Sequence, residues 1–197
     1  MENTNTAVKA LKRNMFIVGR NGGAGVVSHD PRTGKCKKQQ YDTSEAQNDV
    51  LGTMNVVTTV LRTIAGSEPL KNGAVTLYTL DNVAIPAFEC VKHLREANGD
   101  VVAAQQALID SMTARLEGVS DEQLATTGDL LAALADAPRV QIRKISNLRA
   151  VSRENLYGAQ MKELVNHAWN LCPVAALAFE DDAEEASDEA MAAEIEF

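Results

Sequence analysis

Aromatic residues, long apolar runs and cysteines are all scarce in this sequence. Aromatic residues make up only 4% of its 197 residues. The longest apolar stretch, at 173–179, is much shorter than the ~20 residues that cross a bilayer. No apolar segment of signal-peptide length precedes the first basic cluster, so we expect no secretion signal and no membrane partner.

The cysteines and histidines form no recognisable ligand pattern. Cys36, Cys90 and Cys172 are odd in number, widely spaced and free of any CxxC pair. We therefore expect neither a disulfide framework nor a zinc site, but reduced thiols in a cytoplasmic protein. The three histidines are isolated from one another in the sequence, and we predict that they lie at the surface or on helix faces.

Charge is segregated along the chain. The net charge is −8, but nine of the 27 acidic residues lie in 180–197, which contains no basic residue. The preceding 179 residues are close to neutral, with basic stretches at 9–38 and 139–153. These stretches would form one patch if the fold brought them together; the alternative is two separate solvated faces.

Hydrophobic periodicity and turn residues predict an α/β domain. We expect a mixed five-stranded sheet that begins with a three-stranded antiparallel meander and is flanked by helices. The predicted domain spans 14–179, between a flexible leader at 1–13 and a disordered acidic tail at 180–197. The expected strands are 15–20, 26–30, 36–43, 74–85 and 138–147, and the expected helices are 44–66, 86–99, 100–119, 120–137 and 152–171.

This order of elements resembles the ribonuclease H-like fold over about 14–172. Three local matches support the resemblance. "NDVLG" at 48–52 corresponds to a helical acidic motif, "YTLDN" at 78–82 to the end of the fourth strand, and "RENLYGAQ" at 153–160 to the start of the last helix. The resemblance implies the fold, and it places Asp49 and Asp81 at two acidic positions of the family.

The same resemblance argues against the family's usual catalysis. Members that cut RNA in hybrids use four carboxylates to hold two divalent ions. Here the first strand has Val18, Gly19 and Arg20 where an acid is expected, and Ala159 falls at the last acidic position. We therefore predict a protein without catalytic residues or a required cofactor, in which Asp49 and Asp81 would at most hold one Mg²⁺ or Mn²⁺ weakly.

The acidic tail ends in a second recognisable pattern. Its last residues, "AMAAEIEF", combine acids with Met191, Ile195 and Phe197. This resembles the C-termini of bacterial and phage single-stranded-DNA-binding proteins, which replication proteins recognise. The resemblance implies partner binding through Ile195, Glu196 and Phe197, and competition between the tail and a bound strand. The alternatives are a solubilising tail and a terminal helix that docks on its own chain.

These observations together predict a non-catalytic nucleic-acid-binding protein, preferably for single-stranded DNA, acting in replication or recombination in a phage setting. The first, third and fifth strands are expected to be neighbours and to present the phosphate-binding residues, which are Arg20, Lys35, Lys37, Lys38, Arg143, Lys144 and Arg149. One alternative is a divergent metal-dependent nuclease that adds Asp30 or Asp42 to the two acids. Another is a protein-interaction factor or inhibitor without nucleic-acid binding.

Overall fold

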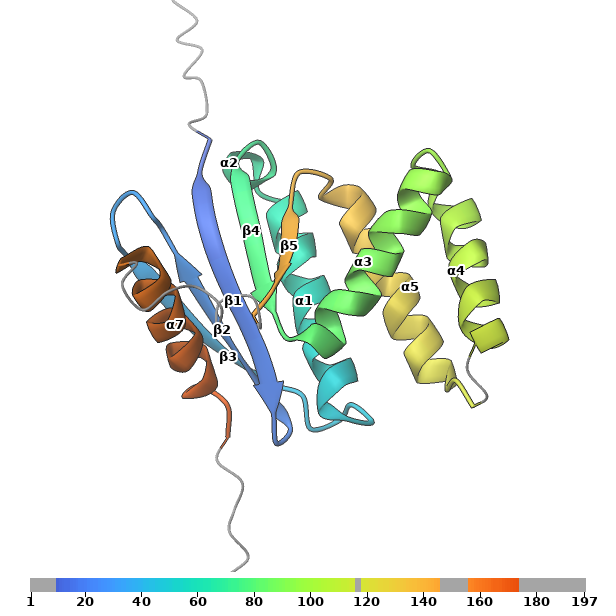
Figure 1. Ribbon diagram of the computed structural model, residues 1–197, viewed down its shortest axis with the longest axis horizontal. Coiled ribbons are helices and arrows are strands. Elements are labelled where there is room, and N and C mark those ends of the chain that lie inside the picture. The colour runs from blue at the N-terminus through green and yellow to red at the C-terminus, as the bar shows by residue number, and fades with distance from the viewer. Residues whose placement is uncertain (1–9, 116–117, 146–155, 174–197) are drawn as a thin grey trace, which may run out of the picture.

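A computed structural model describes residues 10–115, 118–145 and 156–173, and it confirms an α/β domain with a mixed five-stranded sheet flanked by helices (Figure 1). No helix in these ranges is long and apolar enough to span a membrane. The strands are β1 (Lys12–Arg20), β2 (Gly23–His29), β3 (Cys36–Asp42), β4 (Ala74–Thr79) and β5 (Gln141–Lys144). The helices are α1 (Asp49–Ala65), α2 (Glu68–Lys71), α3 (Asp81–Glu96), α4 (Val101–Arg115), α5 (Asp121–Asp136) and α7 (Leu156–Trp169).

The first strand lies in the middle of the sheet. The strand order is β3-β2-β1-β4-β5, in which β2 is antiparallel to both β1 and β3, and β4 is parallel to both β1 and β5. The sheet therefore does not continue outward from β3, as a simple meander would. Instead, the chain crosses back through α1 to place β4 on the other side of β1, so β3 and β5 become the two edges.

Two cores explain why the first strand is apolar on both faces. Met15 and Ile17 face the core beneath α1, α3 and α5, while Phe16 and Val18 face the core beneath α7. Phe16 stacks on Tyr78 of β4, with ring centroids 4.9 Å apart. A central strand that is buried on both faces has a continuous apolar sequence rather than an alternating one, as "MFIV" does here.

Helix α3, which opens the connection from β4 to β5, begins earlier than the sequence suggested. The prediction of a strand over 74–85 was wrong, because β4 ends at Thr79 and α3 begins at Asp81. The carbonyl of Leu80 accepts hydrogen bonds from Val83 and Ala84. Burial of Val83, Ala87 and Cys90 at helical spacing favours the helix over the strand that the sequence up to Ile85 predicts.

The helix predicted over 86–99 would begin at Pro86, but this proline lies inside α3 and not in its first turn.

The cap of α1 also differs from the prediction. The helix begins at Asp49 rather than at 44, and Asn48 caps it: its side-chain oxygen accepts hydrogen bonds from the amides of Val50 and Leu51 at 3.0 Å. An asparagine cap of this kind stabilises a helix by ~1 kcal/mol. Ser44 instead donates its hydroxyl to Asp42 at 2.7 Å and closes a turn before the helix. Ser120 caps α5, and its hydroxyl oxygen accepts a hydrogen bond from the amide of Gln123.

His29 contradicts the expectation of surface histidines. It lies on β2 and is 2% exposed, and its Nε2 is 3.4 Å from the side-chain nitrogen Nε2 of Gln160 on α7. Its Nδ1 is buried with no hydrogen-bond partner among the residues that the structure describes. Burial lowers the pKa of His29 from its ordinary value, while the charge of Asp30 opposes that shift.

The lowered pKa predicts a loss of stability in mild acid. As the pH falls below about 6.5, the unfolded chain takes up a proton at this histidine before the folded chain does, so unfolding becomes more favourable. We expect His29→Gln to reduce the loss of unfolding free energy between about pH 7.5 and 5.5, measured by urea denaturation. His167→Gln, at a half-exposed position on α7, is the matched control for the loss of one histidine. An equal effect of the two substitutions would contradict the prediction.

Candidate nucleic-acid interface

Basic side chains from four segments gather at one end of the sheet. The segments are the start of β1, the β2–β3 turn, the short helix α2, and the loop between α5 and β5. We call this surface the basic end, and define it by Lys12, Arg13, Arg32, Lys35, Lys71 and Arg139. The carboxylates on the same segments are Asp30 and Glu68, so cations outnumber acids by six to two.

Backbone pairing holds three of these segments together. The amide of Leu11 donates to the carbonyl of Pro69, and the amide of Ala74 donates to the carbonyl of Leu11. In the parallel β1–β4 register, Lys12 lies opposite Ala74. Arg139 donates to the backbone carbonyl of Asn72 at 3.5 Å, which links the α5–β5 loop to the end of α2. These main-chain contacts fix the spacing of cations that are far apart in the sequence.

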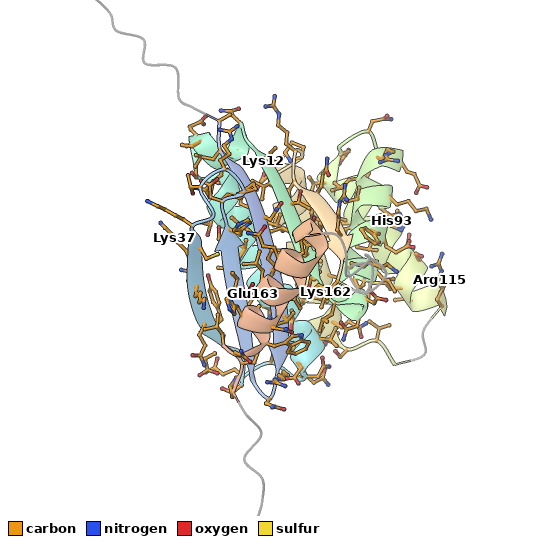
Figure 2. The ribbon with its side chains drawn as sticks, turned by 60° about the vertical axis from the view of Figure 1, so that its left-hand side comes forward. Lys12, Lys37, His93, Arg115, Lys162 and Glu163 are labelled. Carbon is orange, nitrogen blue, oxygen red and sulfur yellow. The ribbon has the colours of Figure 1, made fainter. Side chains whose placement is uncertain are left out.

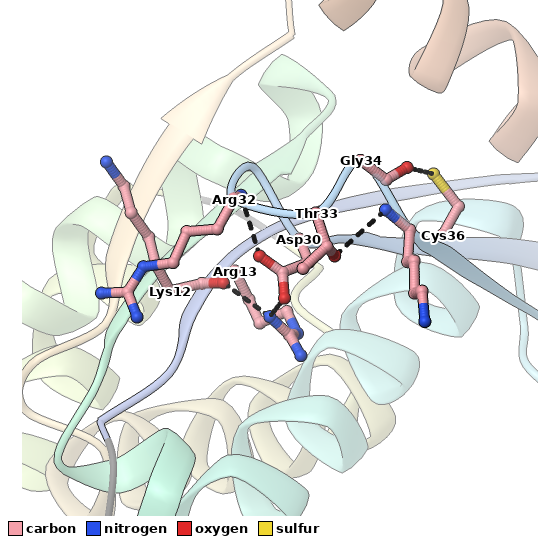
Figure 3. Close-up of polar contacts among 8 residues, drawn as sticks. Lys12, Arg13, Asp30, Arg32, Thr33, Gly34 and Cys36 are labelled. Atoms are coloured by element: carbon pink, nitrogen blue, oxygen red, sulfur yellow. Dashed lines mark hydrogen bonds and ion pairs between the residues drawn. The ribbon is translucent and has the colours of Figure 1, made fainter.

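Asp30 organises the β2–β3 turn, which is the remaining segment of the basic end. Its carboxylate accepts a hydrogen bond from the amide of Arg32 at 2.9 Å and pairs with the guanidinium of Arg13 at 2.6 Å (Figure 3). The Arg32 amide, and then Arg13, lower the pKa of Asp30, so this carboxyl stays ionised and offsets the charge of Arg13. Figure 3 shows Arg32 and Lys12 extending to the same side of the turn, where their charges remain available.

The expectation that the first, third and fifth strands are neighbours was wrong. Because β3 and β5 form opposite edges of the sheet, Lys37 and Lys38 are separated from Arg143 and Lys144 by three strands. Lys37 and Lys38 also alternate between the two faces, since successive residues of a strand point to opposite sides. Figure 2 shows Lys37 at the outer edge of the sheet. The seven predicted residues therefore do not form one patch.

Arg20 makes contacts within the fold. It ends β1, and its guanidinium lies 5.2 Å from the ring centroid of Trp169 on α7. Its Nη2 donates to the carbonyl of Trp169 at 3.4 Å, while its Nε is buried without a hydrogen-bond partner in the described part of the chain. A cation placed at the C-terminal end of a helix is favourable, so Arg20 helps to hold α7 against the sheet.

The remaining predicted phosphate-binding residues are dispersed. Lys35 lies in the β2–β3 turn and belongs to the basic end. Arg143 is exposed on β5 and approaches the side-chain oxygen of Gln141 at 3.5 Å, and Lys144 is half-buried. Arg149 lies outside the described residues, as do the predicted partner-binding residues Ile195, Glu196 and Phe197.

The predicted metal ligands lie at the other end of the sheet. Asp49 uses both carboxylate oxygens to accept hydrogen bonds from the amides of Asn21 and Gly22, at 2.9 and 3.0 Å. This fixes the β1–β2 turn to the start of α1. Asp81 begins α3 after β4 and makes an interaction of its own. Within the described ranges, no group of three or more acidic, histidine or cysteine side chains could hold a metal ion.

Most of the basic end was missed by sequence reasoning. Lys12, Arg13 and Arg32 lie in the basic stretch 9–38, and Arg139 starts the stretch 139–153, but none was singled out. Lys71 lies in neither stretch. The sequence did hold one signal. Neighbouring parallel strands start at the same end of a sheet, so basic residues near the starts of the predicted strands 15–20, 74–85 and 138–147 should meet there.

Cys36 provides a chemical probe beside this surface. It is exposed at the start of β3, whereas Cys90 and Cys172 are buried. Burial raises the pKa of Cys90 to about 12 and also raises that of Cys172. We expect a thiol reagent at neutral pH to modify one cysteine in the folded protein and three in denaturant, as counted by mass spectrometry. Modification of Cys90 or Cys172 at the rate of Cys36 would contradict this expectation.

Comparison with known proteins leaves the family open. No protein-family model matches the sequence, and no curated protein matches it. Two solved structures of the foamy virus protease–reverse transcriptase are similar. The native prototype foamy virus protein has 8% identity, a TM-score of 0.49, and coverage of 86% of this chain and 22% of that one. The complex with an RNA/DNA hybrid has 10% identity, a TM-score of 0.44, and coverage of 83% and 20%. This chain therefore spans about a fifth of those proteins, and TM-scores below 0.5 do not establish a shared fold.

Proposed function

We propose that this protein binds nucleic acid without cleaving it, through the basic end of its sheet. The observation that supports this proposal is the gathering of six cations from four segments around only two carboxylates. One of these carboxylates, Asp30, is already paired with Arg13. Lys12, Arg32, Lys35, Lys71 and Arg139 remain to contact phosphates, and neutralising phosphates with Lys and Arg supplies most of non-specific affinity.

The domain is proposed to have a ribonuclease H-like fold, on the order of its elements and the sheet that they form. The proposal of a non-catalytic role is supported by the use of Asp49 to bind the β1–β2 turn. Two hard cations would need that carboxylate together with further oxygen ligands. Single-stranded DNA is the proposed ligand, in replication or recombination, because of the resemblance of the acidic tail to single-stranded-DNA-binding proteins.

The acidic tail is proposed to compete with the strand for the basic end. The described chain stops at Pro173, whose carbonyl accepts a hydrogen bond from Asn21 at the opposite end of β2. The seven residues of β2 span about 23 Å. The tail from 180 to 197 reaches about 60 Å when extended, so it can return along the sheet to the basic end. Its terminal residues are also proposed to contact a replication or recombination protein.

The experiment is a fluorescence anisotropy titration of a labelled single-stranded oligonucleotide across a salt series. It compares the full chain with a chain that stops at Phe179. We expect both to bind, with tighter binding by the shortened chain. If four or five phosphates are contacted, the slope of log K against log salt should be about −3.

Three outcomes would contradict parts of the proposal. Absence of binding by either chain at low salt would exclude nucleic-acid binding and favour a protein-interaction factor. Equal affinity of the two chains would exclude the tail as a competitor. Loss of the labelled strand in Mn²⁺, abolished by Asp81→Asn, would show that the protein is a nuclease.

A further inference from the structure

The third helix carries an exposed apolar surface that the proposed function does not use. The large apolar side chains exposed within the described ranges are Ile85, Phe88, Val91 and Val102, at 49%, 38%, 36% and 78%. Three of the four lie on α3. They are spaced by three residues, which places them on neighbouring turns of one side of the helix.

The opposite side of α3 is already buried. Val83, Ala87 and Cys90 face the core shared with α1 and α5. Ala84 lies four residues before Phe88, on the side of the exposed row, and is itself buried. Figure 1 shows α3 crossing the outside of α5, with α4 alongside. Ile85, Phe88 and Val91 are therefore only partly covered by the elements that the structure describes. An apolar row on an outer helix, flanked by charges, is the kind of surface that marks a protein contact.

The row is symmetric about its central residue. Asp81, Ile85, Phe88, Val91 and Arg95 are all exposed, and the steps between them are four, three, three and four residues. An acid begins the row and a base ends it. If two copies of α3 pair in antiparallel fashion about Phe88, each Ile85 meets Val91 of the partner copy. Each Asp81 then meets Arg95 of the partner copy, and a twofold interface requires this self-complementarity.

The other charges on α3 are consistent with this pairing. Lys92, which lies beside Val91, pairs with Glu89 of the same helix at 3.8 Å, and Glu96 approaches His93 at 3.6 Å. Arg95 has no ion pair among the described residues. Asp81 makes an interaction within its own chain, and its charge can still attract a second cation. The row therefore favours a partner surface with a base opposite Asp81 and an acid opposite Arg95.

From this arrangement we infer that α3 is the interface of a homodimer, formed by antiparallel packing of two copies about Phe88. Two hollows border the row and can receive side chains of the partner copy. One, of about 300 Å³, lies beside Ile85, Pro86 and Glu89, and the other, of about 260 Å³, lies beside Val91 and Leu94. The inference goes beyond the proposed function and rests on different residues.

The size of the surface sets the expected affinity. From Asp81 to Arg95 the row is about 21 Å long, because each helical residue adds 1.5 Å. One helix pair of this length buries less than the roughly 1,200 Å² of a stable standard interface. We therefore expect a reversible dimer with a dissociation constant of roughly 1–100 µM. The acidic tail fits this surface less well, since Asp81, Asp121 and Glu122 begin the helices beside it.

The first test is sedimentation velocity of the full chain across this range of concentration. We expect the weight-average sedimentation coefficient to rise from the monomer value toward the dimer value. Phe88→Glu should abolish the rise, because the twofold axis brings two new carboxylates together. Val102→Glu, at a more exposed apolar residue on α4, is the matched control and should preserve it. A monomer at every concentration, or a dimer that survives Phe88→Glu, would overturn the inference.

A disulfide test determines the direction of packing. In a Cys36→Ser background, Phe88→Cys should form a crosslinked dimer under mild oxidation, because the two copies of residue 88 face each other. Ile85→Cys alone should not crosslink, but an equal mixture of Ile85→Cys and Val91→Cys chains should. Crosslinking of Ile85→Cys chains to each other would show parallel packing and overturn the antiparallel arrangement.

A charge exchange provides a readout that does not depend on apolar area. Asp81→Arg and Arg95→Asp are each expected to weaken the dimer several-fold, and the double variant should recover most of the loss. Circular dichroism checks that α3 is intact, since both changes oppose the helix dipole. Failure of the double variant to recover, with the helix intact, would exclude the Asp81–Arg95 contact.

Discussion

Replacing both Lys12 and Arg32 by glutamate is expected to weaken binding of single-stranded DNA about a hundredfold at ~50 mM salt. Both residues are exposed, and they extend to the same side of the turn that Asp30 organises (Figure 3). For a single strand, each lost phosphate contact removes about 0.7 from the slope of log K against log salt. Between 1 M and ~50 mM salt this amounts to roughly one decade of affinity for each contact.

The matched control for this prediction carries the same change of charge elsewhere. Arg115→Glu alters the C-terminal end of α4, which Figure 2 shows far from Lys12. Arg32→Glu alone should reduce affinity about tenfold and lower the magnitude of the salt slope, whereas Arg115→Glu should change neither appreciably. Anisotropy titrations at four or more salt concentrations measure both quantities. Equal losses from the two single substitutions would show that net charge, rather than the basic end, determines binding.

Cys36 gives an independent measurement of the same contact. It lies next to Lys35, directly after the turn that carries Arg32. A strand bound at the basic end should slow its modification by a thiol reagent, and this protection should disappear in high salt as the strand dissociates. Unchanged modification at saturating oligonucleotide would place the bound strand elsewhere on the protein.

The order of the elements other than α2 could be predicted because short-range signals agree with the packing. The apolar residues of α1 recur at helical spacing, and Leu51, Met54, Leu61 and Ile64 are all buried. Pro31 and Gly34 mark the turn between β2 and β3, where the amide of Asp30 donates to the carbonyl of Lys35 at 2.9 Å. In such segments the local pattern and the tertiary environment favour the same structure, so sequence alone is sufficient.

The start of α3 could not be predicted because local preference and tertiary packing disagree. The residues from Val75 to Ile85 are rich in strand-forming types, and only the burial of Val83 and Ala87 against the helical layer distinguishes helix from strand after Thr79. The parallel pairing between β4 and β5 is also short. Because β5 is limited to Gln141–Lys144, β4 pairs with it only from Thr76 to Thr79, and this pairing does not extend β4 beyond Thr79.

The candidate interface depended on strand order, which the sequence does not state directly. Charge runs identified 9–38 and 139–153 correctly as basic, but they did not show which parts of each stretch would meet. The parallel register brings Lys12 beside Ala74, and the hydrogen bond from Arg139 to Asn72 adds the second stretch. Arg20 illustrates the opposite case. It seemed available from sequence, yet Trp169, 149 residues later, engages it.

Gly25→Ala should destabilise the protein by about 3 kcal/mol, because a side chain at this position collides with the backbone of α7. A Cβ atom built on Gly25 falls well inside contact distance of the carbonyl oxygen of Ala168, and lies 2.8 Å from Cβ of Leu171. Gly25 does not have a positive φ, so the alanine backbone itself is unstrained. The cost therefore comes from moving α7 away from β2, and not from the strand.

Displacement of α7 would open the second core of the molecule. Phe16, Val18 and Val27 on the sheet are covered by Met161, Leu164 and Val165 of that helix. Separating the two layers exposes apolar surface at about 25 cal/mol per Å², so a shift of the helix is costly even if the strands remain paired. Trp169, the single tryptophan of the chain, lies on α7 and reports the movement directly.

Urea denaturation of Gly25→Ala, followed by circular dichroism and by tryptophan fluorescence, measures this effect. Gly128→Ala is the matched control. It lies inside α5, and its Cβ would meet only the exposed, flexible side chain of Gln105, whose nitrogen is 2.7 Å away. Alanine is favoured over glycine inside a helix by ~1 kcal/mol, so we expect this variant to be neutral or slightly more stable. If α7 moves without general unfolding, the fluorescence of Gly25→Ala should shift to the red before urea is added. Equal stability of the two variants, with unchanged fluorescence, would show that α7 does not pack against Gly25 in solution.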